Sequence, residues 1–137
     1  MSLISDIRGA LQLQARTAAG FPPDNQIDYE GKPFSPTIGT PWARMTLLNN
    51  SRQPFSLDGL SKITGGLFQV DLFYPIDKGT ADIDVVADAV VDAFPLNRNL
   101  FKGTTRVSIY YAQRAPLLQQ PDSIHAPITV SWRCFPN

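Results

Sequence analysis

Apolar and polar residues alternate with period two along four separate segments, and this pattern constrains the fold of the chain most. The segments comprise residues 42–48, 67–74, 105–111 and 128–134. In the last of them, Val130 and Trp132 alternate with Ser131 and Arg133. Such alternation is typical of antiparallel strands that have one face on a core and the other on solvent. The sequence therefore predicts an antiparallel sheet of four main strands.

Two other segments have the three- and four-residue spacing of apolar residues that is typical of amphipathic helices. The first helix is expected within residues 2–20, with an apolar face made of Ile4, Ile7, Leu11, Ala15 and Ala18. The second is expected within residues 80–94, with an apolar face made of Ile83, Val86, Ala87, Val90 and Phe94. Each helix precedes two strands. We therefore expect one α+β domain over residues 1–137, with both helices packed on one face of the sheet.

A proline-rich stretch, residues 21–41, separates the first helix from the first strand. Its prolines are Pro22, Pro23, Pro33, Pro36 and Pro41. Proline lacks the N–H that a central strand must donate to its neighbour. Residues 26–30 are therefore expected to add only a short edge strand, after which Gly31 turns the chain.

Each strand pair is joined by a long connection, residues 49–66 and residues 112–127. Connections longer than about 12–15 residues are usually functional or disordered. The first one is more apolar than a solvated linker should be, and we interpret it as an arm that contacts another protein chain. Its candidate contact residues are the apolar anchors Phe55, Leu57 and Leu60 and the basic residues Arg52 and Lys62. The alternative is an arm that folds back on its own sheet.

A second candidate interface lies on the polar face of the predicted sheet, where aromatic side chains occur beside arginines. Its members are Trp42, Arg44, Phe73 and Tyr110, with Arg106 and Arg133 on the same face. Exposed aromatic residues among few charges are typical of protein interfaces, whereas nucleic-acid surfaces need clustered basic residues. The pattern favours contact with protein.

Three carboxylates follow one another at four-residue spacing on the second predicted helix: Asp84, Asp88 and Asp92. Like charges at this spacing destabilise a helix by about 0.2–0.5 kcal/mol per pair. A straight helix face does not supply the six or more oxygens that hard cations require. The stripe is therefore either a solvated face or a docking surface for basic groups of a neighbouring chain.

The sequence offers little for catalysis, and we expect no enzyme activity, cofactor or metal. His125 is the one histidine, and it is expected on the surface in a loop of alanine and proline. The single Cys134 excludes an internal disulfide and a cysteine-based zinc site. Nine residues of extended chain would separate His125 from Cys134 by about 25–30 Å, which is too far for the two side chains to act together. Because Cys134 shares the parity of Val130 and Trp132, it is expected to be a buried, unreactive thiol.

The charges balance at 12 Lys and Arg against 12 Asp and Glu, and only 18% of residues are charged. A protein that grips nucleic acid by charge needs a surplus of basic residues. A lightly charged, neutral surface also does little to keep copies of a protein apart. No apolar run approaches the roughly 18 residues of a membrane span, and the first residues lack the pattern of a signal peptide. These features indicate a soluble subunit of an assembly.

Several segments, in order and spacing, resemble the bacteriophage tail terminator proteins. They are residues 27–36, the Pro-Trp-Ala-Arg that opens a strand at 41–44, residues 65–75, a helix rich in Ala, Asp and Val that ends at Phe94, and residues 126–132. The resemblance spans nearly the whole chain. It implies an α+β fold, which agrees with the order of elements expected from the patterns above.

The resemblance further implies a structural role without catalytic residues. Such proteins form a ring, generally six-fold, on the end of the completed tail tube, where they stop polymerisation and offer a surface for joining the head. The expected partners are further copies of the chain, the tube protein and the head-completion or connector protein. DNA passes through the ring without being read. The protein is then expected in the virion, at the head-proximal end of the tail, after assembly in the host bacterial cytoplasm. The alternatives are a head-completion or adaptor protein, a tail-tube protein, and a small enzyme or ligand-binding domain.

Overall fold

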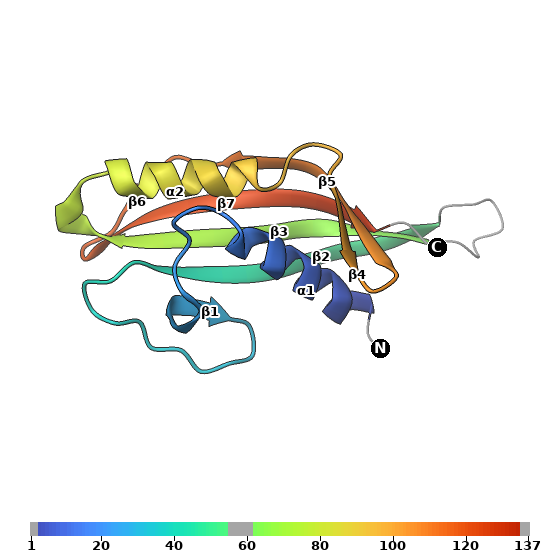
Figure 1. The fold of residues 1–137 in the computed structure, drawn as a ribbon, viewed down its shortest axis with the longest axis horizontal. Coiled ribbons are helices and arrows are strands. Elements are labelled where there is room, and N and C mark those ends of the chain that lie inside the picture. Colours follow the sequence, from blue (N-terminus) through green and yellow to red (C-terminus); the bar gives the residue numbers. More distant parts are fainter. Residues whose placement is uncertain (1–2, 55–61, 135–137) are drawn as a thin grey trace.

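The computed structural model describes residues 3–54 and 62–134, which form two α-helices, two short 3-10 helices and seven strands (Figure 1). In chain order the elements are α1 (Leu3–Arg16), η1 (Asp24–Gln26), β1 (Ile27–Tyr29), β2 (Trp42–Pro54), β3 (Lys62–Pro75), η2 (Ile76–Lys78), α2 (Ala81–Asp92), β4 (Asn99–Lys102), β5 (Thr105–Arg114), β6 (Leu118–Gln119) and β7 (Ser123–Cys134).

The strands form one mixed sheet in the order β1-β2-β3-β7-β5-β4, and β6 pairs with the start of β7. The sheet curls into a half-barrel as β5 and β4 turn over toward α1 (Figure 1). The prediction of a four-stranded antiparallel sheet is therefore wrong. The four expected strands are present, but β1 pairs with β2 in parallel, and β4 and β6 are additional.

The parallel pairing of β1 follows from the proline-rich stretch. A parallel neighbour needs a connection of about a dozen residues, because the chain must return to the end from which it started. Residues 30–41 provide that connection, and they place Ile27 opposite Ala43 and Tyr29 opposite Met45. The expected short edge strand is thus confirmed, but its direction could not be inferred from alternation. Strands β4 and β6 escaped prediction because each is short and mostly exposed.

The two long connections are mostly strand, which corrects their interpretation as loops. Strand β2 continues past residue 48 to Pro54, and β3 begins at Lys62 rather than at residue 67. Pro54 lies opposite Lys62, and a bulge lies between Asn49 and Ser51. The second connection contains the end of β5, all of β6 and the start of β7. Backbone hydrogen bonds between strands do not require apolar side chains, so pairing extends where the alternation of hydropathy has ended.

Both helices pack their apolar stripes on the same face of the sheet, as predicted. Ile7, Leu11, Ala15 and Ala18 of the first stripe are buried, and Ile4 is partly buried. All five residues of the second stripe are buried. They meet the core-facing residues of the central strands, among them Phe68 of β3 and Trp132 of β7. Alternation along the strands therefore identified the core, apart from Tyr111 of β5, which is exposed.

Trp132 is the largest fully buried side chain. Within residues 3–54 and 62–134, its Nε1–H has no hydrogen-bond acceptor. An indole N–H is a donor only, and leaving a donor unpaired in a core costs about 1–3 kcal/mol. The buried apolar area of Trp132 thus stabilises the core, and its unpaired N–H reduces that stabilisation.

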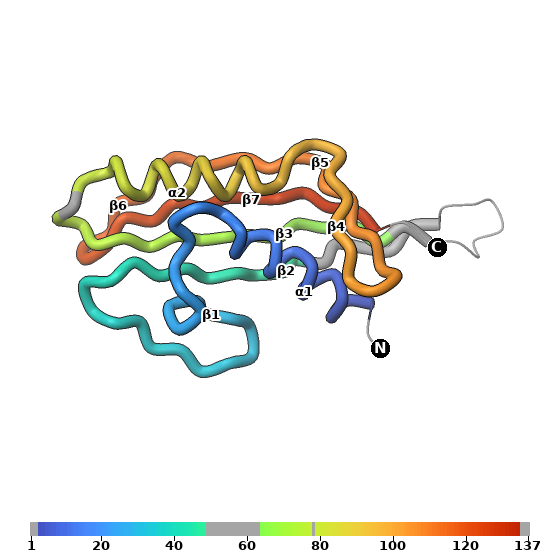
Figure 2. The backbone as a smooth tube through the Cα atoms, in the orientation of Figure 1, coloured from blue at the N-terminus to red at the C-terminus, as the bar shows by residue number. Residues whose placement is uncertain are grey.

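The two ends of the long axis are built from different elements. The start of α1, the β4–β5 turn and the end of β7 lie at one end, and η2, β6 and the start of β7 lie at the other (Figure 2). Strand β7 runs from one end to the other, so residues at its two termini are far apart. In the part of the chain that the structure describes, no helix has the length and apolar character that crossing a membrane requires.

Candidate functional site

Three rings stack across the outer face of the sheet, the face away from the helices. Trp42 of β2, Phe73 of β3 and His125 of β7 occupy paired register positions. Trp42 and Phe73 have ring centroids 4.1 Å apart, and Phe73 and His125 have centroids 4.5 Å apart, both with planes inclined by 12°. Phe34 lies 5.3 Å from Trp42 and extends the cluster toward the proline-rich segment. The structure therefore brings the predicted Trp42 and Phe73 together.

Arg44 is also part of this cluster, as the sequence predicted. Its guanidinium carbon lies 5.3 Å from the Trp42 ring centroid and 5.6 Å from that of Phe73, within the range of cation–π attraction. Its Nε donates to Asp28 Oδ2 of β1 at 3.0 Å. Arg44 thus holds the edge strand to the aromatic stack.

His125 does not lie in an exposed loop, which corrects the expectation from the sequence. Its side chain is 15% exposed, and its Nε2 lies 2.7 Å from Oδ1 of Asp71. The same oxygen accepts a hydrogen bond from Nε2 of Gln69 at 2.9 Å. Asp71 is a buried carboxylate on the outer face, and these two side chains supply its hydrogen bonds. His125 and Asp71 were missed as members of the site.

His125 was expected in a loop because Pro127 suggests that the last strand begins only after it. The Pro127 carbonyl accepts from the Ala115 N–H at 3.0 Å, so the proline nitrogen faces the same side of β7. On that side the neighbour changes from β5, which ends opposite Ile128, to β6, which begins opposite His125. The missing N–H at Pro127 therefore lies just past the end of the β5 ladder, and the strand continues through it.

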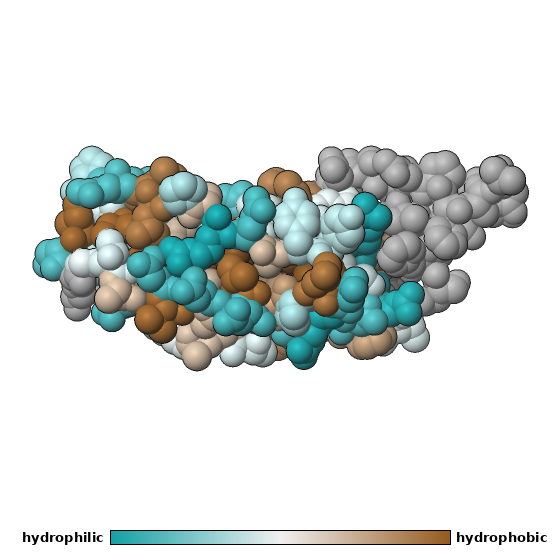
Figure 3. Space-filling view, turned by 90° about the horizontal axis from the view of Figure 1, so that it is seen from above, coloured by the Kyte–Doolittle hydropathy of each residue, from teal (hydrophilic) through white to brown (hydrophobic). Residues whose placement is uncertain are grey.

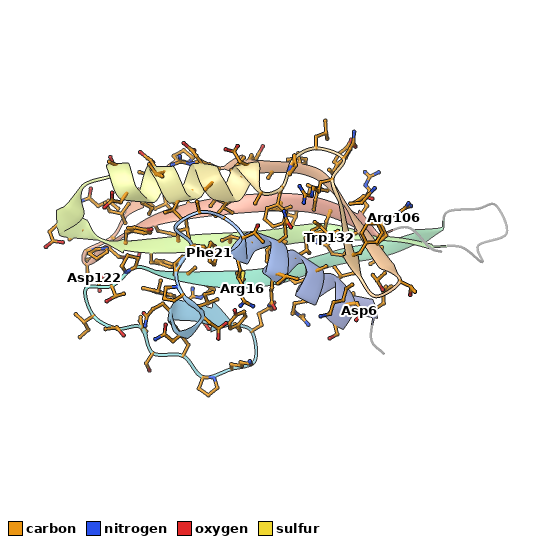
Figure 4. The ribbon with its side chains drawn as sticks, in the orientation of Figure 1. Asp6, Arg16, Phe21, Arg106, Asp122 and Trp132 are labelled. Carbon is orange, nitrogen blue, oxygen red and sulfur yellow. The ribbon has the colours of Figure 1, made fainter. Side chains whose placement is uncertain are left out.

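A surface cavity of about 880 Å³ opens beside the aromatic stack. Its walls are the stack itself, the segment 36–40 that approaches from the β1 side, and residues 75–77 and 120–123. Two carboxylates, Asp77 and Asp122, line it. Figure 4 shows Asp122 at the end of the molecule opposite Arg106. This cavity and the ring stack form one continuous candidate surface, which we call the cavity end.

Tyr110 lies at the other end of the outer face, apart from the aromatic stack. The guanidinium of Arg133 lies 4.7 Å from its ring centroid. A bulge in β5 between Ile109 and Tyr111 shifts the register, so Tyr111 pairs with the outer-face residue Ser131. With Tyr110 on the polar face, strict alternation along residues 105–111 predicts Tyr111 on the core, and this is wrong because the bulge adds a residue. Two consecutive tyrosines are consequently exposed.

The carboxylate stripe of α2 is held from within the same chain at two of its three positions. Arg114 of β5 donates from Nη2 to Asp84 Oδ1 at 2.7 Å and from Nη1 to Asp88 Oδ1 at 2.8 Å. These hydrogen bonds, first to Asp84 and then to Asp88, raise the pKa of Arg114 above its ordinary value. Asp92 is exposed. Arg114 was missed because a pairing between β5 and α2 has no signature in local sequence.

The surface seen in Figure 3 shows hydrophilic and hydrophobic residues interspersed rather than one continuous apolar patch. A docking face for an apolar partner would show such a patch. The Arg114 pairs favour a stripe that fixes α2 to the sheet. Docking of a neighbour's basic group at Asp92 stays a prediction.

We expect Arg114→Ala to lower the free energy of unfolding by about 1 kcal/mol, since partly exposed ion pairs contribute roughly 0.2–1 kcal/mol each. The loss should shrink at high salt, which screens such pairs. Urea unfolding at low and high ionic strength measures both effects. Arg98→Ala, which removes an exposed arginine beyond the same helix, is the matched control. Equal losses in the two variants would contradict a specific role of Arg114.

The predicted arm residues are only partly within the described chain. Arg52 lies in β2 and Lys62 begins β3, so the backbone at both positions is paired across the hairpin. Phe55, Leu57 and Leu60 lie outside the described residues. Their role in contact with another chain stays a prediction.

Cys134 is buried at the end of β7, as expected, and burial raises the pKa of its thiol. A raised pKa keeps the thiol protonated and unreactive. Across the described ranges, no group of three or more His, Cys, Asp or Glu side chains is placed to hold a metal ion.

Fold and surfaces together define a two-layer α+β domain whose outer face carries the aromatic stack and the cavity. The same fold occurs in a solved structure that bears no functional name, with a TM-score of 0.78, 20% identity and coverage of 100% of this chain and 99% of the other. It also occurs in a chain from the virion of a native gene transfer agent particle, with a TM-score of 0.68, 14% identity and 98% coverage of both chains. No curated protein sequence matches the chain.

The family follows from the sequence itself. A family model described as phage tail terminator protein matches residues 6–132, nearly the whole length. The chain belongs to the phage tail terminator protein family, and the resemblance seen in its motifs is confirmed. It is a structural protein of a phage tail.

Proposed function

We propose that this protein forms a ring on the end of the tail tube, stops tube polymerisation and presents the surface to which the head joins. The single observation that carries the proposal is the family match over residues 6–132. The ring is expected to be six-fold, and DNA passes through it without sequence-specific contact. The tube protein and the head-completion or connector protein are its partners beyond further copies of itself. Assembly takes place in the host bacterial cytoplasm, and the ring occupies the head-proximal end of the tail.

Two features of the molecule support a role in assembly. The long hairpin of β2 and β3 projects along the long axis away from the helices (Figure 1). Its predicted apolar anchors and the basic Arg52 and Lys62 suit contact with the tube or with a neighbouring copy. The outer face adds aromatic side chains and arginines, the residue types that interfaces concentrate.

The polymerisation-stopping role can be tested by producing particles without this protein and measuring tail lengths in electron micrographs. We expect overlong tubes that lack heads, because nothing would end tube growth. Adding the protein back should restore a single tail length. Tails of normal length beside unjoined heads would contradict the proposal and indicate an adaptor instead.

A further inference from the structure

The outer face of the sheet carries two chemically opposite ends. At the cavity end, the carboxylates are Asp77 and Asp122, with Asp82 at the start of α2 nearby. Burial, and after it the negative charge of Asp82, raises the pKa of Tyr74, which lines the cavity. Arg44 also lines the cavity but is paired with Asp28.

The other end of the outer face is basic and aromatic. Arg106 lies opposite Phe101 in the β4–β5 pair, and Arg133 lies opposite Ser108, the next outer-face position along β5. Tyr110 is in contact with Arg133, and Phe101 is 64% exposed. We call Phe101, Arg106, Tyr110 and Arg133 the arginine end. Arginines and exposed aromatic rings on one patch are the composition of interface hot spots.

These two ends cannot satisfy each other within one molecule. Ser123 borders the cavity, and Arg133 lies ten residues further along the same strand. At about 3.3 Å per residue, the two ends are roughly 33 Å apart. Figure 4 shows the separation directly, with Asp122 and Arg106 at opposite ends of the long axis. Among the residues that the structure describes, neither end can therefore supply the complement of the other.

We propose that the arginine end of one copy docks on the cavity end of the next. The carboxylates Asp77 and Asp122 would receive the guanidinium groups of Arg106 and Arg133, and the cavity would receive an aromatic side chain of the same patch. The two surfaces differ, so the contact is head-to-tail, and a head-to-tail contact closes into a ring when the rotation between copies permits. The inference deepens the proposed ring and rests on it.

Charge exchange between copies tests this contact. One variant, Asp77→Lys/Asp122→Lys, makes both ends basic, and a second, Arg106→Glu/Arg133→Glu, makes both ends acidic. Like charges across an interface oppose association. We expect each variant alone to be incorporated into sedimented tails at least about tenfold less than the unaltered protein. In an equimolar mixture every contact can pair opposite charges, so incorporation should return with the two variants in equal amounts.

The control is Arg16→Glu/Lys32→Glu, which reverses two exposed charges that lie against Asp24 and Tyr29 rather than at either end, and it should assemble normally. Circular dichroism establishes that each variant is folded. The head-to-tail contact would be overturned if either variant alone assembled like the unaltered protein. It would also be overturned if the mixture of folded variants stayed as defective as either one. If the charge exchange failed in this way but particles without the protein still had overlong tubes, the tail-ending role would be supported and only this interface would be excluded.

Discussion

Replacing Trp132 by alanine is expected to lower the free energy of unfolding by about 4 kcal/mol. The side chain is fully buried between the sheet and the helices, and truncation of a buried Phe or Trp to Ala typically costs about 3–5 kcal/mol. Domains of this size are stable by only about 5–15 kcal/mol, so the loss removes a large fraction of the total stability. Urea unfolding followed by circular dichroism measures the change without depending on tryptophan fluorescence.

The matched variant Trp132→Phe separates packing from the unpaired N–H. Phenylalanine keeps an aromatic ring in the core and removes the donor that has no acceptor in the described chain. The gain from removing that donor, about 1–3 kcal/mol, offsets the loss of ring area. The net change should stay below about 1 kcal/mol. A loss as large as that of the alanine variant would show that the Nε1–H contributes a hydrogen bond.

Phe55→Asp combined with Leu57→Asp should abolish the joining of heads to tails while the monomer stays folded. If these side chains are buried in an interface, two unpaired carboxylates would oppose its formation by several kcal/mol. Since about 1.4 kcal/mol is a factor of ten, infectious particles should fall by at least about 100-fold. Complementation of a strain that lacks the protein, scored by plaque counts, measures this.

A double substitution at two serines of the same segment provides the control. Ser56→Asp combined with Ser61→Asp adds the same two negative charges but leaves Phe55, Leu57 and Leu60 unchanged. It should retain most of the activity. Equal failure of both variants would attribute the effect to charge, and normal tails in the Phe55 and Leu57 variant would exclude the arm as a contact.

The core was predictable from sequence because burial follows local periodicity. The stripes of α1 and α2 and the inward residues of the four main strands, apart from Tyr111, lie where their spacing indicates. The mixed character of the sheet was not predictable from alternation, because hydropathy reports which face a residue occupies and not the direction of its neighbour. The bulge at Tyr110 moves Tyr111 to the outer face, and no glycine or proline at that position indicates the bulge in the sequence.

The candidate surfaces were predicted in part. Alternation placed Trp42, Arg44 and Phe73 on one face, where they do meet. The partners of the charged residues were not predictable, since Asp71 and His125 are 54 positions apart and Asp84 and Arg114 are 30 apart. Such pairs form only after the strands have been ordered, and no local pattern encodes that order.

The two tryptophans give the molecule two distinct optical reporters. Trp132 is enclosed in the core, so its emission should follow folding and little else. Trp42 is partly exposed in the ring stack at the cavity end of the outer face. In Trp132→Phe protein, Trp42 is the sole indole, and its emission would report arrival of a neighbouring copy at that end. Folding and subunit contact can therefore be followed separately without attaching a dye.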